Sequence, residues 1–268
     1  MKANPKKPSG LLHSSFRFDK VTLNLYLPSP DLELYIEHYW IVKWDLRGQE
    51  PFVSENLPHP SVHLVIDEGV SQIVGIVKEK FSRLLQEKGF VFGIKFRPGA
   101  FYPFVNIPVY QFTGRSIPAH DVFGADIAQL EETILSTDDE SEMVKCSEVF
   151  IRKRLPRHDE SVTLIKTIVD FVMSDREIIT VEDIASRFNC STRMLQRLFK
   201  KYVGISPKWV IQRYRLLEVA DHLASSHSPT WSQFASDLGY YDQSHFIKDF
   251  KSIVGLSPEE YVRKNSRV

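Results

Sequence analysis

The feature that most constrains the fold of this chain is an eleven-residue segment that occurs twice in similar form. RLFKKYVGISP occupies residues 197–207 and returns as KDFKSIVGLSP at residues 248–258. The likeness extends upstream to Ala185 and Ala235, with one extra residue in the second copy. Two short copies are too few for a solenoid, in which several repeats stack to bury a continuous core. The sequence therefore predicts a duplicated small module in the C-terminal half.

Each copy has the pattern of a helix, a tight turn and a second helix. Residue types that cap helices by accepting from free backbone N–H groups stand at the four expected starts: Thr180, Ser191, Thr230 and Asp242. Gly204 and Gly255 are predicted to end the second helices in the left-handed conformation. A Ser-Pro pair follows each glycine and is expected to begin a further helix, where proline loses no hydrogen bond.

The helix that begins at Pro207 is expected to continue to about residue 226 and to join the two modules. Its roughly 20 residues would span about 30 Å, close to the ~34 Å of one duplex turn. Two second helices on one chain could then enter successive major grooves from the same side.

The second helix of the first copy has one apolar face and one face of hydrogen-bond donors. The apolar face holds Leu195, Leu198, Phe199 and Tyr202, and the donor face holds Arg193, Gln196, Arg197 and Lys200. The second copy offers Gln243, Ser244, His245, Ile247, Lys248 and Lys251. Arg and Lys can bond guanine, Gln can bond adenine, and an apolar group can contact the thymine methyl. This pattern favours reading of a DNA major groove.

The net charge of the chain is zero, yet one window is strongly basic. Residues 184–217 contain no acid and eight bases: Arg187, Arg193, Arg197, Lys200, Lys201, Lys208, Arg213 and Arg215. We interpret this window as an anion-binding surface, because solvated charged faces usually mix both signs.

The first 155 residues differ in character from the rest. Alternating runs at 61–67, 72–77 and 90–99, separated by Gly and Pro, predict a β-rich and barrel-like region, with flanking helices near 31–39, 125–135 and 139–155. The polar segment 152–162 is the expected linker. The predicted fold class is α+β, with a sensor or dimerisation domain at 1–155 and an all-helical DNA-binding domain at 156–268, built of two helix-turn-helix units joined by a long helix.

Several function classes are disfavoured by what the sequence contains. The cysteines Cys146 and Cys190 lie far apart, which indicates neither a disulfide framework nor a zinc site. No apolar run is long enough for a membrane span and the N-terminus lacks a secretion signal, so we expect a cytoplasmic protein that does not enter a membrane. Phosphate loops, nucleophile elbows and metalloprotease helices do not occur, so we expect no enzyme and no cofactor.

Residues 162–264 resemble the DNA-binding region of the AraC/XylS family of bacterial transcription regulators. The resemblance lies in Ala185, Ser191, Leu195, Arg197, Phe199, Lys200, GISP, Arg215, Ala220 and Leu223, and then in Ala235, GYYDQSHFIKDFK and GLSPEEY. It implies two helix-turn-helix units that bind double-stranded DNA. One departure is Asn189, where many members have a turn glycine, although Asn also tolerates that geometry.

The resemblance also implies which residues contact DNA. These are Ser191, Thr192, Arg193, Gln196, Arg197 and Lys200 in the first module and Gln243, Ser244, His245 and Lys248 in the second. Between residues 230 and 255 there are three acids and two bases, so the second module is expected to bind more weakly or to contact mainly phosphates.

The N-terminal half more loosely resembles an uncharacterised domain that precedes this region in some members, on HYW (38–40), LPHPSVHLVI and GIKFRPGAFYPF. It implies a sensor or dimerisation domain, with a small-molecule effector, RNA polymerase and a second copy as expected partners. Eight Phe or Tyr within 90–112 could line an apolar pocket or form core. His59 and His63 stand four apart, but flanking prolines disfavour a helical metal site. An N-terminal enzyme fused to a DNA-binding module is the alternative reading.

Overall fold

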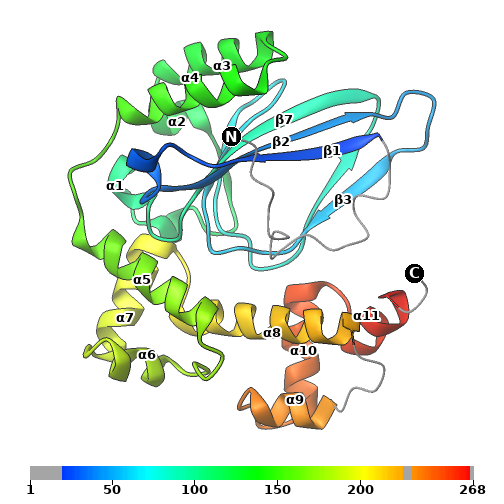
Figure 1. Cartoon of the computed structure of the whole chain (residues 1–268), viewed down its shortest axis with the longest axis vertical. Helices are drawn as coiled ribbons and strands as arrows, with labels where there is room; N and C mark the ends of the chain where they lie inside the picture. Colours follow the sequence, from blue (N-terminus) through cyan, green and yellow to red (C-terminus); the bar gives the residue numbers. More distant parts are fainter. Residues whose placement is uncertain (1–19, 226–230, 266–268) are drawn as a thin grey trace.

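The computed structural model describes residues 20–225 and 231–265. An antiparallel sheet with helices against it forms the first part of the chain, and a purely helical part follows (Figure 1). The predicted α+β class is therefore confirmed. Within these described residues no helix is both long and apolar enough to span a membrane.

The main sheet has six strands in the order β1-β2-β7-β4-β5-β8, and a separate ribbon pairs β3 with β6. The sheet strands are β1 (Val21–Tyr26), β2 (Ile36–Asp45), β4 (His63–Ile66), β5 (Gln72–Val74), β7 (Lys88–Phe96) and β8 (Ser116–Pro118). The ribbon strands are β3 (Phe52–Asn56) and β6 (Phe81–Leu85). Among the strands described, β1 and β8 pair on one side only, so the sheet is open and the expected barrel-like arrangement is wrong.

The helix expected near 31–39 is also wrong. A single short turn η1 (Pro30–Leu32) precedes strand β2 there. Buried residues of this segment have the spacings of three and four that are typical of a helix: Leu32, Tyr35, Ile36 and Tyr39. Pairing with β7, from Ile36 opposite Phe96 to Asp45 opposite Lys88, overrides this local pattern.

Helices cover one face of the sheet (Figure 1). They are α1 (Tyr102–Val105), η2 (Val109–Gln111), α2 (Ala119–Phe123), α3 (Asp126–Ser136) and α4 (Glu140–Arg152). The helices expected near 125–135 and 139–155 are thus confirmed as α3 and α4. Glu140 fixes α4 to the sheet, because its carboxylate accepts from Tyr26 Oη at 2.5 Å and from Asn24 Nδ2 at 3.0 Å.

The C-terminal part contains the two predicted helix-turn-helix units. Its helices are α5 (Glu160–Ser174), α6 (Val181–Arg187), α7 (Thr192–Leu198), the widened turn η3 (Phe199–Val203), α8 (Pro207–Ser225), α9 (Trp231–Asp237), α10 (Gln243–Val254) and α11 (Pro258–Asn265). Helix α8 runs across the molecule, with α6 and α7 at one end and α9 and α10 at the other (Figure 1). The joining helix expected from Pro207 is confirmed.

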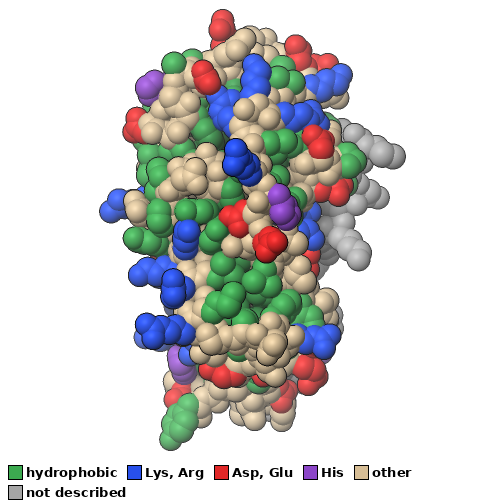
Figure 2. Space-filling view, turned by 90° about the vertical axis from the view of Figure 1, so that its left-hand side faces the viewer, with side chains coloured by type: hydrophobic (Ala, Val, Ile, Leu, Met, Phe, Trp, Pro, Cys, Tyr) green, Lys and Arg blue, Asp and Glu red, His purple; other side chains and the backbone are tan. Residues whose placement is uncertain are grey.

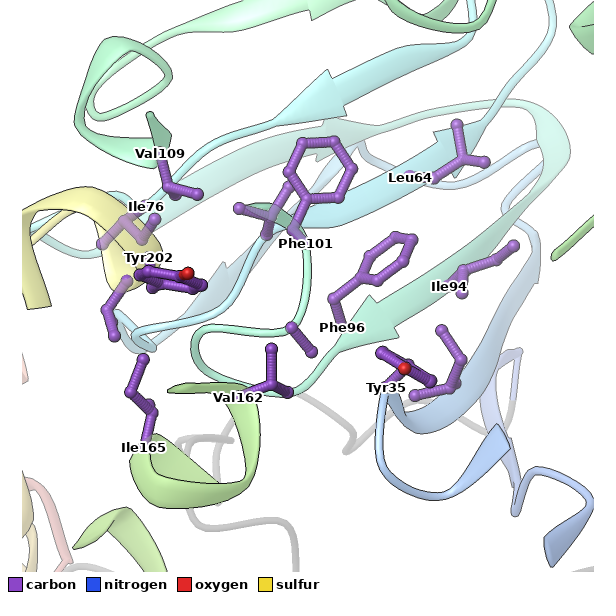
Figure 3. Packing of buried hydrophobic residues seen from close by; sticks show 14 of the residues in the cluster. Tyr35, Leu64, Ile76, Ile94, Phe96, Phe101, Val109, Val162, Ile165 and Tyr202 are labelled. Atoms are coloured by element: carbon purple, nitrogen blue, oxygen red, sulfur yellow. The ribbon is translucent and has the colours of Figure 1, made fainter. Parts of the chain in front are cut away.

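The largest hydrophobic core joins the two parts of the chain (Figure 3). It contains Ile94 and Phe96 of the sheet together with Val162 and Ile165 of α5 and Tyr202 of η3. The second module has its own core around α10, and a third cluster lies on the other face of the sheet. A domain boundary at residues 155/156 stays a prediction, and the shared core shows that the first module is packed against the N-terminal half.

Candidate nucleic-acid interface

The local signals in the first module produce the geometry that they predict. Thr180 Oγ1 accepts from Asp183 N at 3.1 Å, and the Asp183 carboxylate accepts from Thr180 N at 2.7 Å, which forms a capping box. Asn189 takes a φ of 48° in the turn. Ser191 Oγ then accepts from Met194 N at 3.1 Å and begins α7. The turn and the start of the second helix are therefore fixed by residues close in sequence.

Helix α7 buries its apolar face and exposes its donors. Leu195 is fully buried and Phe199 nearly so. The predicted contact residues Ser191, Arg193, Gln196, Arg197 and Lys200 are exposed, and Thr192 is half-buried. Met194 is 45% exposed on the same helix, a position that the sequence reasoning left out. Lys and Arg side chains follow one another along the left-hand edge of the lower half in Figure 2.

The second module repeats this arrangement. Asp242 accepts from His245 N at 2.8 Å and begins α10, where Phe246 and Phe250 are fully buried. The predicted residues Gln243, Ser244, His245 and Lys248 are exposed. The start Thr230 lies outside the described residues.

Tyr241, in the turn before α10, is 98% exposed, and the sequence reasoning also missed it. Its position in the sequence could have indicated this exposure, because it directly precedes the cap residue Asp242 in the turn. Its neighbour Tyr240 packs against the second core instead.

Both second helices end as predicted. Gly204 has a φ of 86° and Gly255 a φ of 83°, the left-handed conformation that favours glycine. The next helices start at the Ser-Pro pairs: Trp209 N donates to Ser206 Oγ at 3.2 Å, and Glu260 N donates to Ser257 Oγ at 3.3 Å. Helix α8 between the modules has 19 residues, which corresponds to about 28 Å.

Two of the eight bases in the basic window do not belong to a surface. Arg213 is fully buried and Arg215 is 3% exposed. Arg215 donates to the carbonyl oxygens of Val172, Asp175 and Ile178, at the end of α5 and in the loop that follows. Their inclusion in the anion-binding surface was wrong, because backbone acceptors distant in sequence hold these guanidinium groups inside the protein.

The N-terminal half contacts the widened turn η3, which continues α7. Lys200 Nζ lies 5.0 Å from the centre of the Tyr110 ring, and Lys201 Nζ lies 4.5 Å from that of Tyr102. Thr113 Oγ1 donates to the Gly204 carbonyl oxygen at 2.7 Å. The tip of Lys200 is thus shared between solvent and an aromatic ring of the other half.

The aromatic residues of 90–112 pack largely on one another. The Phe101 ring lies 5.0 Å from that of Phe96 in an edge-to-face contact (Figure 3). It lies 5.6 Å from the Phe112 ring, also edge to face. All three residues are at most 2% exposed. The structure favours core packing over a pocket lining for these rings.

Family comparisons match two separate regions of the chain. Residues 184–264 match the family described as "Helix-turn-helix domain". Residues 24–118 match the family described as "Domain of unknown function (DUF6597)". The helix-turn-helix assignment is confirmed, and the second match coincides with most of the sheet.

Named relatives are similar over about a third of this chain. The HTH-type transcriptional activator RhaS of Escherichia fergusonii is 34% identical over 84 residues, which are 31% of this chain and 30% of that protein. The lactose operon transcription activator of Staphylococcus xylosus is 35% identical over 98 residues, 36% of this chain and 35% of that protein. The chain thus spans about a third of the length of these relatives.

A solved structure, the C-terminal domain of AraT, a response regulator from Geobacillus stearothermophilus, is 27% identical. It covers 37% of this chain and 84% of its own, with a TM-score of 0.33.

Proposed function

We propose that this chain, whose residues 184–264 form a helix-turn-helix domain of the AraC/XylS type, is a cytoplasmic transcription regulator that binds double-stranded DNA at specific sequences. The observation that carries the proposal is the same in both modules. A capped second helix buries two aromatic or aliphatic anchors and exposes polar donors at its N-terminal end. Donors in this position match the requirement for contacts with base edges in a major groove.

The roles of the residues follow from their chemistry. Arg193, Gln196 and Arg197 are proposed to read bases in the first module, since Arg bonds guanine and Gln bonds adenine. The cap residue Ser191, the first helical residue Thr192 and the lysine Lys200 are proposed to contact phosphates. In the second module the base-reading and phosphate contacts are assigned to the following residues: Gln243, Ser244, His245 and Lys248.

Two exposed apolar or aromatic side chains extend this set. Met194 and Tyr241 lie beside the proposed readers in the first and second module respectively. Each can contact the methyl group of thymine or a deoxyribose. They are therefore proposed as additional DNA contacts.

Acidic side chains of the second module accept hydrogen bonds from groups within the protein. This reduces the weakening of DNA binding that their charges would otherwise cause in this module. Asp242 caps α10, and Asp249 accepts from Gln212 Nε2 at 3.2 Å and lies 3.6 Å from His245 Nε2. A carboxylate that is held by internal donors opposes a DNA phosphate less than a free one does. We propose that the second module adds affinity mainly through Lys248 and the N-terminal end of α10.

The N-terminal half is proposed as the sensor and dimerisation region, with a division near 155/156. Its shared core with α5 and its contacts with η3 provide a physical route by which a small-molecule effector could alter the first module. RNA polymerase and a second copy of the chain are proposed partners. An N-terminal enzyme fused to a DNA-binding module is the alternative proposal.

A fluorescence-anisotropy titration tests the proposal on the full chain, with duplexes selected from a random pool and with unselected duplexes. Arg193→Ala should weaken binding to the selected duplex by about 1–3 kcal/mol, the value of a bidentate base contact, and change binding to random DNA little. Arg157→Ala, an exposed base before α5, is the matched control and should change neither. Binding without any sequence preference or salt dependence would refute the function. Equal losses on both duplexes would show that Arg193 contacts only phosphate.

A further inference from the structure

Three basic side chains form a row across the sheet, on the face turned away from the main core. Lys95 of β7 pairs with His38 of β2 on one side and with His63 of β4 on the other. Residues directly opposite one another on neighbouring strands point to the same face. The alternate residues of these strands, such as Tyr39 and Ile94, fill the main core on the opposite face.

The row contains more hydrogen-bond donors than acceptors. Lys95 Nζ donates to Glu37 Oε1 at 2.9 Å, and an ammonium group carries two further N–H donors. His63 Nδ1 accepts from Trp40 Nε1 at 3.1 Å, so the proton of the neutral imidazole must lie on Nε2. His63 therefore offers a second N–H group on the same face.

The positions of these donors are fixed by their surroundings. Trp40 crosses Gly93, where an added Cβ would lie 1.9 Å from the indole ring, and this close approach lets the indole reach His63. A β-bulge between Ile36 and His38 brings Glu37 to the side of Lys95. The backbone of three strands thus fixes the positions of these donors.

The charges around the row are mostly positive. Arg97 and the buried Arg213 of α8 both act on Lys95, and Glu37 is the acid paired with it. Burial lowers the pKa of Lys95, and it lowers the pKa of His38 to about 4 and that of His63 to about 3. The imidazoles are therefore neutral donors, and the guanidinium and ammonium groups supply the charge.

The row can be reached from solvent. The exposed fractions are 11% for the Lys95 side chain, 17% for that of His38 and 27% for that of Glu37. Lys95, His38 and Glu37 thus each keep part of their side-chain surface in contact with solvent.

We infer that Lys95, His63 and His38 form a binding site for a small molecule that carries an oxyanion, either a carboxylate or a phosphate. The oxyanion would accept from Lys95 Nζ and from His63 Nε2, and its charge would offset the excess of positive groups in a partly buried place. The inference deepens the proposed function, on which its regulatory meaning rests, by giving the chemical class of the effector.

The site lies where an effector could influence the helix between the two modules. Arg213 of α8 donates to the carbonyl oxygen of Pro58, and the His59 ring packs edge-on against Tyr214 at 6.4 Å. His59 itself is close enough to Lys95 and Arg213 for their charges to lower its pKa, after the larger effect of burial. Binding at Lys95 would therefore alter the electrostatic field at α8.

The test titrates sodium phosphate, and separately sodium acetate, into the full chain without DNA, at constant ionic strength set by sodium chloride. Calorimetry measures binding, and tryptophan fluorescence, to which Trp40 beside the row contributes together with the other three tryptophans, provides a second signal. Wild type should bind at least one of the two anions, and Lys95→Met should raise the Kd at least tenfold. Lys88→Met removes an exposed lysine from the same strand and should leave the Kd unchanged.

A second pair of variants separates the donor role of His63 from simple folding effects. His63→Gln keeps an acceptor for Trp40 and an N–H donor for the anion, and it should retain binding. His63→Leu keeps neither and should lose it. No binding of either anion by wild type, or an unchanged Kd in Lys95→Met, would overturn the inference. Sequence-specific DNA binding is measured separately, so a chain that binds DNA but neither anion would refute this site alone.

Discussion

The duplication provides an internal control for the contact between the two halves of the chain. Gly204 and Gly255 occupy equivalent places and have nearly the same φ, 86° and 83°. An alanine at Gly204 would place its Cβ 2.9 Å from Thr113 Oγ1 and 2.9 Å from the Val109 carbonyl oxygen. At Gly255 the nearest atom is Cδ of Lys80 at 2.8 Å, on a flexible side chain that can move.

We expect the two alanine variants to differ in stability for this reason. The left-handed backbone conformation at these positions lowers the unfolding free energy by about 1–2 kcal/mol in either alanine variant. Gly204→Ala must also displace backbone of η2, which costs about 1–3 kcal/mol as overpacking. It further disturbs the hydrogen bond from Thr113, worth about 1 kcal/mol. The expected losses in unfolding free energy are therefore about 1–2 kcal/mol for Gly255→Ala and about 3–6 kcal/mol for Gly204→Ala.

Urea unfolding of the full chain, followed by far-UV circular dichroism, measures the difference. Thr113→Val serves as a partial variant, because it removes the hydrogen bond without strain in the helix end, and it should lose about 1 kcal/mol. Equal losses in the two alanine variants would refute the view that the N-terminal half is tightly packed against η3, where the second helix of the first module ends.

Two further predictions concern buried basic groups. Arg215→Met should lower the unfolding free energy by about 3–5 kcal/mol, because it leaves buried carbonyl oxygens without donors. Arg193→Met, at an exposed site, should change the unfolding free energy by less than about 0.5 kcal/mol. Equally small losses for both variants in urea unfolding would contradict the role of Arg215. Burial lowers the pKa of His38 from 6.5 to about 4 and that of His63 to about 3. As the pH falls from 6.5 towards 4, the unfolded chain therefore binds more protons than the folded chain does. The unfolding free energy should fall over this window by an amount on the order of 2–3 kcal/mol per histidine. His38→Gln should flatten this pH dependence in urea unfolding, and a wild-type stability that is constant across the window would contradict the burial of neutral imidazoles.

The duplicated modules could be predicted because their signals are local. Ser191 and Asp242 each cap a helix through a backbone N–H three residues away. The donor face of α7 also follows from spacing alone, since residues three and four apart share a helix face. The candidate DNA contacts could accordingly be assigned to exposed helix positions from the sequence alone.

The errors arose where residues distant in sequence compete with the local pattern. Leu32, Tyr35, Ile36 and Tyr39 are spaced as on a helix, yet pairing with β7 some sixty positions later makes a strand of this segment. Arg215 counts as a surface base in the sequence, yet the end of α5 supplies acceptors that bury it. Periodicity and charge counts contain no information about such partners.

The sequence by itself determined the two helix-turn-helix units, the glycines that end their second helices and the donors that these helices expose. Interactions between residues at most about four positions apart determine all of these features, so they can be predicted from the local sequence. Only the tertiary structure decided that the sheet stays open, that the first module packs against the N-terminal half, and that His38, Lys95 and His63 form one row. Strand register and core packing join residues tens of positions apart, and the side chains they bring together are known only once the chain has folded.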